Sequence, residues 1–226
     1  MVISQDIIFI HIAKTGGMSC ADFLLKNLRS PIYNCYTPLV KKPKQGMLPG
    51  VTIVADVGRH IHLRKARPHV QRLTGKSIEE MGKILAIIRH PFTLEYSYFR
   101  HLQRPQIAKR RQKGSSELVK LAQGDFKTFV AKAGHLRPGG TQEDYFLIDG
   151  ERPDNLQLIR FEELSNTFPE AVKDYLVAGR DAQFPMLNAS GPSTELQSLL
   201  DEETRELIYH KHRYMFDKGY YSTDWP

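Results

Sequence analysis

The sequence predicts an α/β fold, a single domain over residues 1–226 in which helices flank a central parallel β-sheet. Two segments carry this prediction, Ile7 to Leu25 and Ile84 to Leu102, because each reads as a buried strand that turns directly into an amphipathic helix. Apolar runs rich in β-branched residues are typical of parallel strands that are covered on both faces. The length fits one such domain, since α/β folds commonly exceed about 200 residues without dividing.

The first segment predicts an anion-binding loop. Ile7 to Ile12 is the expected strand, and the apolar residues from Met18 onward recur at helical spacing. The turn between them therefore lies at a helix N-terminus, where unpaired N–H groups and the positive end of the helix dipole attract anions. The expected loop residues, to which the lysine adds a full positive charge, are Lys14, Thr15, Gly16, Gly17, Met18 and Ser19.

A further predicted strand, Val51 to Ala55, leads to two candidate catalytic histidines, His60 and His62. Both follow the carboxyl end of the strand, which is where ligands collect in open α/β sheets. A neutral imidazole accepts a proton near neutral pH, so either histidine suits a general base. His11 shares a face of the first strand with apolar residues, and we interpret it as a packing residue.

The second segment predicts another phosphate contact. Ile84 to Ile88 is the strand, and Pro91 suits the first turn of the following helix, so Arg89 emerges at the end of the strand. Ser97 lies about two helical turns further on. An arginine and a hydroxyl in this arrangement can bind one phosphate through charge and a hydrogen bond.

The remaining sequence predicts further elements of the same domain. Asp125 to Ala133 reads as a helix and Asn155 to Arg160 as a short strand. The next helix buries Leu164, Phe168 and Val172, and a last amphipathic helix runs from Leu196 to Ile208.

Composition limits the classes of partner. A net charge of +7 and a pI near 9.3 favour an anionic partner. The densest basic run, Lys109 to Lys113, has no interleaved aromatic residues, so we interpret it as a solvated loop and expect no nucleic-acid partner.

No apolar run approaches the ~20 residues of a membrane span, and no signal peptide is evident. Cys20 and Cys35 are too few for a disulfide scaffold, which favours a cytoplasmic protein.

The loop departs from a Walker A motif, G-x-x-x-x-G-K-[ST], because Lys14 and Thr15 precede the glycines. The segment His11 to Ser19, HIAKTGGMS, resembles instead the 5'-phosphosulfate loop of the sulfotransferases, often written P-K-T-G-G-T-S. Ala13 and Met18 replace the usual proline and threonine.

The second segment is similar to the 3'-phosphate motif of the same family, R-D-P-x-x-R-x-x-S. Arg89, Pro91 and Ser97 keep its spacing, whereas His90 and Leu94 replace the aspartate and the second arginine. Two looser resemblances follow. Residues 160–164 (RFEEL) resemble a structural R-[FY]-E-x-L segment, and residues 185–190 (PMLNAS) resemble a P-x-x-N-x-S loop that approaches the nucleotide.

This resemblance implies a P-loop, nucleotide-kinase-like sulfotransferase fold and the donor 3'-phosphoadenosine 5'-phosphosulfate (PAPS), with 3'-phosphoadenosine 5'-phosphate (PAP) as product. Lys14 would stabilise the departing 5'-phosphate oxygen. His60 takes the base position, and one residue of slippage in the alignment would pass that role to His62. The chemistry requires no metal. Similarity to the carbohydrate and heparan-sulfate branch favours a sugar hydroxyl as acceptor.

Two alternatives stay open on the sequence. Asp56, at the end of a predicted strand, imitates a Walker B aspartate, which would fit a kinase-like phosphotransferase that uses ATP. The basic composition would also fit a nucleic-acid-binding protein.

Overall fold

The computed structural model describes residues 1–36, 48–107, 116–133, 140–178, 183–185 and 194–224. Two expectations lie outside these residues, namely the solvated loop at Lys109 to Lys113 and most of the loop at residues 185–190. Internal contacts divide the chain into two compact units. We call them the sheet unit, Met1–Ile88 with Asp144–Ala189, and the helical unit, Arg89–Glu143 with Ser190–Pro226.

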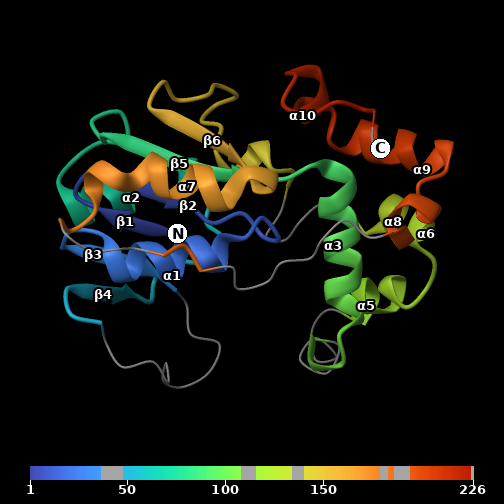
Figure 1. The fold of residues 1–226 in the computed structure, drawn as a ribbon, viewed down its shortest axis with the longest axis horizontal. Coiled ribbons are helices and arrows are strands. Elements are labelled where there is room, and N and C mark those ends of the chain that lie inside the picture. The colour runs from blue at the N-terminus through green and yellow to red at the C-terminus, as the bar shows by residue number, and fades with distance from the viewer. Residues whose placement is uncertain (37–47, 108–115, 134–139, 179–182, 186–193, 225–226) are drawn as a thin grey trace. The chain divides into compact units, whose positions relative to one another are not determined.

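The sheet unit contains a mixed sheet whose strand order is β4-β3-β1-β2-β5-β6 (Figure 1). The strands are β1 Val2–Ser4, β2 Ile7–Ile10, β3 Ile32–Cys35, β4 Val51–Val54, β5 Lys83–Ile88 and β6 Leu156–Arg160. The α/β class is confirmed, but the sheet is mixed where a parallel one was predicted, because β1 runs antiparallel to both of its neighbours. Only Gln5 and Asp6 separate β1 from β2, and so short a link permits only an antiparallel pair.

The other five strands share one direction. β2 pairs parallel with β5, β5 with β6, and β3 with β4, while β1 reverses the direction twice between β2 and β3. The carboxyl ends of these five strands consequently lie at one edge of the sheet. The loop after β2 and the segment after β4, which carry Lys14 and His60, both begin at this edge.

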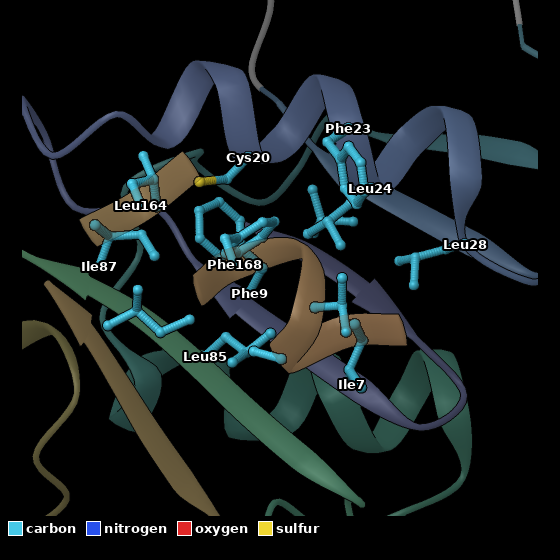
Figure 2. Packing of buried hydrophobic residues seen from close by; sticks show 14 of the residues in the cluster. Ile7, Phe9, Cys20, Phe23, Leu24, Leu28, Leu85, Ile87, Leu164 and Phe168 are labelled. Carbon is cyan, nitrogen blue, oxygen red and sulfur yellow. The ribbon is translucent and has the colours of Figure 1, made fainter. Parts of the chain in front are cut away.

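The α-helices in the described residues of the sheet unit are α1 Gly17–Asn27, α2 Leu63–Thr74 and α7 Leu164–Val172. Figure 2 shows α1 and α7 packing together over one face of the sheet, where Phe9, Phe23 and Phe168 meet. Burying a side chain of this size stabilises the fold by about 1.5–3 kcal/mol. The predicted apolar face of α1 is partly wrong, since Met18 is 48% exposed while Cys20 is fully buried.

The helical unit is built from helices in the described residues. They are α3 Pro91–Gln103, α5 Ser116–Ala122, α6 Phe126–Lys132, α8 Thr194–Leu199, α9 Glu202–Lys211 and α10 Arg213–Asp217. The predicted helix at Asp125 to Ala133 is confirmed, with Asp125 as the N-cap of α6. The predicted last helix is instead two, because Asp201 caps a new helix by accepting from the Thr204 N–H.

No helix in the described ranges combines the length and apolar character that crossing a membrane requires.

Candidate functional site

The loop after β2 makes a tight turn into α1. Lys14 and Gly16 both adopt left-handed conformations, with φ of 67° and 79°, and Gly16 is the N-cap of α1. Thr15 is fully buried, and its hydroxyl donates to the Ile12 carbonyl over 3.1 Å, which ties the loop to the end of β2. In the first helical turn that follows, the Ser19 N–H donates to the Gly16 carbonyl over 3.0 Å. The Gly17 and Met18 amides precede the first i→i−4 hydrogen bond, as at any helix N-terminus.

Both glycines of the loop are required by close packing. A Cβ on Gly16 would lie 2.7 Å from Leu164 Cδ2 and 3.1 Å from the Phe161 ring, in addition to the strain of its positive φ. A Cβ on Gly17 would lie 2.2 Å from Cδ2 of His11. Two residues of the segment 160–164, Phe161 and Leu164, thus pack against the loop.

The segment after β4 brings His60 next to the end of β2. Its Nδ1 lies 2.7 Å from the carbonyl oxygen of His11. A carbonyl can only accept a hydrogen bond, so Nδ1 carries the proton. In neutral His60 the lone pair is therefore on Nε2, which leaves this nitrogen as the proton acceptor of the ring.

The side chain of His11 connects this base to the loop. Its ring is 5% exposed and makes an edge contact with the His60 ring, with 4.7 Å between centroids. The same ring also packs against Gly17. Arg59 makes a second connection, because its Nη1 donates to the Met18 sulfur over 3.1 Å. Within the sheet unit, His60 and Arg59 accordingly lie beside the first turn of α1.

His62 has a different setting. It is the N-cap of α2, and its ring packs against the buried Tyr145 with 4.5 Å between centroids. The two candidate bases are thus held by different elements, His60 by the end of β2 and His62 by Tyr145.

Burial lowers the pKa of His60 below its ordinary value of 6.5. The hydrogen bond to the His11 carbonyl favours the protonated ring and opposes this shift, whereas the charge of Arg59, and that of the Met1 amino group when it is protonated, adds to it. Burial lowers the pKa of this amino group to about 5. Burial also holds the pKa of His11 well below 6.5, with smaller contributions from the Met1 amino group, His60 and Arg59. Both rings are therefore neutral at pH 7.

Arg59 is a site residue that sequence reasoning missed. It is half-buried, its guanidinium lies 4.5 Å from the centre of the Tyr36 ring, and burial lowers its pKa. A signal was present, since no acidic residue occurs between Asp56 and Glu79 although six lysines and arginines do. Such a segment either pairs with distant carboxylates or keeps uncompensated charge.

The six cations divide into two groups. Three of them pair with acidic side chains, Arg67 with Glu79, Arg72 with Asp56, and Lys76 with Asp6. The other three are Arg59, Arg64 and Lys65, and in the described part of the chain none of these has a carboxylate partner. The uncompensated cations are those closest to His60 in the sequence, which makes this segment attractive to an anion.

The second predicted phosphate contact lies in the helical unit. Arg89 is buried, and its backbone N–H and carbonyl are both hydrogen-bonded to the Gln142 side chain, at 2.8 and 2.9 Å. Its Nε donates to Thr93 Oγ1 over 3.0 Å. Ser97 is half-buried one turn beyond Thr93 on α3. Thr93 was missed, although it lies four residues before Ser97 on the same face of α3 and four residues after Arg89, which precedes the helix.

Comparison of the chain with family models, with curated proteins and with solved structures gives no match in any of the three.

Proposed function

We propose that the chain is a PAPS-dependent sulfotransferase with a P-loop, nucleotide-kinase-like fold. The observation that carries the proposal is the setting of His60. Its protonated Nδ1 is committed to the His11 carbonyl, its basic Nε2 is left for an incoming hydroxyl, and its ring contacts the residue that packs on Gly17. A base beside the N-terminus of a helix is suited to chemistry at an anionic group bound there.

The roles follow from the chemistry of sulfuryl transfer. The acceptor oxygen forms a bond to sulfur while the bond from sulfur to the bridging 5'-phosphate oxygen breaks, and the acceptor proton passes to His60 Nε2. The products are a sulfate ester and PAP. Lys14 and the amides of the loop from Thr15 to Met18 neutralise the charge that develops on the leaving phosphate. General-base help of this kind typically contributes about 10² to 10⁴ in rate.

Uncompensated positive charge supports an anionic donor. Arg59 is half-buried without a carboxylate partner in the described residues, so its charge is available to an anionic ligand. Its contact with Met18 brings the guanidinium to the turn at which the 5'-phosphosulfate would bind.

The surroundings of Asp56 weigh against a kinase-like phosphotransferase. Its carboxylate is exposed and 2.9 Å from Arg72, and it follows β4, which is an edge strand separated from β2 by β3 and β1. A Walker B aspartate would have to reach a magnesium ion held at the loop after β2.

Two measurements test the proposal. Titration calorimetry should show that PAP binds much more tightly than ATP, without dependence on magnesium. A screen with PAPS carrying radiolabelled sulfate should show transfer to a hydroxyl, and we propose a sugar hydroxyl as the acceptor. Preference for ATP with magnesium would favour the phosphotransferase instead. Salt-sensitive oligonucleotide binding that PAP does not displace would favour a nucleic-acid-binding protein.

A further inference from the structure

His11 is the most buried ionisable side chain near the proposed base, and the mechanism above uses only its backbone carbonyl. The ring is 5% exposed, and within the described residues neither ring nitrogen makes a hydrogen bond. Burying an imidazole in this way costs free energy relative to an apolar ring of the same size.

The contacts of the His11 ring suggest a role for it. One side meets the His60 ring in an edge contact at 4.7 Å and 71°. Another edge, Cδ2 and Nε2, lies against Gly17 so closely that a Cβ there would be 2.2 and 2.4 Å from these atoms. The Phe9 ring adds a third contact at 6.1 Å between centroids. The imidazole of His11 therefore packs against both the proposed base, His60, and Gly17, the first residue of α1.

We infer that the side chain of His11 is a positioning residue, which sets the separation between the proton acceptor of His60 and the anion-binding turn at Gly17. The inference rests on the proposed function for its consequence in catalysis, but its geometry can be tested without activity. The backbone carbonyl of His11 orients the His60 ring, and the side chain fixes how far that ring stands from the loop. His11 thus contacts both the proposed base and the proposed anion-binding turn.

The charge state of the ring fits this role. A protonated His11 would place a positive charge directly against His60, which already faces Arg59 and the Met1 amino group. Because His11 stays neutral on burial, it adds no further charge that would disfavour protonation of His60 during the reaction.

Three variants separate positioning from packing. His11→Ala removes the imidazole, His11→Phe keeps an aromatic ring of similar size, and His69→Ala removes a histidine on α2 that the mechanism does not use. In His11→Ala, water should reach His60, so the midpoint of its NMR titration should rise toward 6.5. Transfer should fall about ten- to a hundredfold, since a misplacement of about 1 Å can cost that much. His11→Phe should restore most of both properties, and His69→Ala should change neither.

A role in packing alone would lower thermal stability without moving the His60 midpoint. An unchanged midpoint in folded His11→Ala, or an equal shift in His69→Ala, therefore overturns the inference. The unmodified protein supplies a test that no folding defect can affect. Nuclear Overhauser contacts should join the His11 ring protons both to the Gly17 Hα protons and to the His60 ring, and their absence overturns the inference as well. A His60 midpoint that depends on His11, in a protein that transfers no sulfate, would uphold the positioning and reject the proposed function.

Discussion

Replacing Gly17 by alanine should damage the site through a single new methyl group. The added Cβ would lie 2.2 Å from His11 Cδ2 and 2.4 Å from Nε2, whereas ordinary contacts begin near 3.4 Å, so the ring must move by about 1 Å. Forcing a methyl group into a packed site costs about 1–3 kcal/mol. Alanine recovers up to about 1 kcal/mol of helix propensity. We expect Gly17→Ala to lower the free energy of unfolding by about 1–2 kcal/mol.

The matched control is Gly58→Ala. Gly58 lies on the segment that carries His60, has no positive φ, and has no atom within 4 Å of a built Cβ. Both variants remove one glycine from the unfolded chain, so that contribution is similar in the two. Thermal unfolding should separate them by roughly 2–8 °C, at about 2–4 °C per kcal/mol for a chain of this size. The His60 midpoint should also change only in Gly17→Ala. Equal melting temperatures and midpoints would refute the packing of His11 on Gly17.

Three further outcomes are expected. The transfer rate should rise with pH to a plateau, because only the neutral ring of His60 accepts a proton. The midpoint of this rise should lie below 6.5, since burial lowers the pKa of His60. A midpoint above 7 in kcat measured from pH 5 to 8 would contradict this. Arg89→Ala should weaken PAP binding by about ten- to a hundredfold in calorimetry yet spare adenosine 5'-phosphosulfate, and equal losses would place Arg89 elsewhere. Glu95→Gln should cost about 3–5 kcal/mol in urea unfolding, because it leaves the half-buried Lys211 and the buried His212 without their anion.

The pH dependence of that last cluster follows from the same contacts. Burial alone would raise the pKa of Glu95, but the charge of Lys211 and the 2.7 Å hydrogen bond from His212 outweigh it and hold the pKa below 4.5. A lowered folded-state pKa contributes stability above the unfolded value, and this contribution is lost as pH falls through the folded value. Urea unfolding of the unmodified protein from pH 6 to pH 3 should show this loss, and Glu95→Gln should not.

Those elements of the fold could be predicted whose local sequence alone indicates a strand or a helix. β2 and β5 are buried runs followed by helices, and the sequence places both correctly. β1 and β3 were missed because they are three and four residues long, and their strand character depends on pairing with each other and with β2. Pairing between distant segments leaves no local pattern. The antiparallel β1 was consequently missing from the predicted sheet.

The site shows the same limit. The loop from Lys14 to Ser19 could be located from its glycines and its position between strand and helix. The hydrogen bond between His60 and the His11 carbonyl could not be predicted, since the two residues are 49 positions apart in the sequence. This contact forms only when the segment after β4 folds back to the end of β2. Arg59 was visible as charge in a segment without acids, but not as a neighbour of Met18.

The choice between His60 and His62 shows what the geometry adds to an alignment. A general base must hold the positive charge that it gains, so its partners matter as much as its position. The His11 carbonyl accepts from His60 Nδ1 and stabilises that charge. His62 is the N-cap of α2, where the positive end of the helix dipole opposes a gained positive charge. Because the carbonyl of His11 accepts from His60 whereas His62 is itself an N-cap residue, we propose His60 rather than His62 as the base.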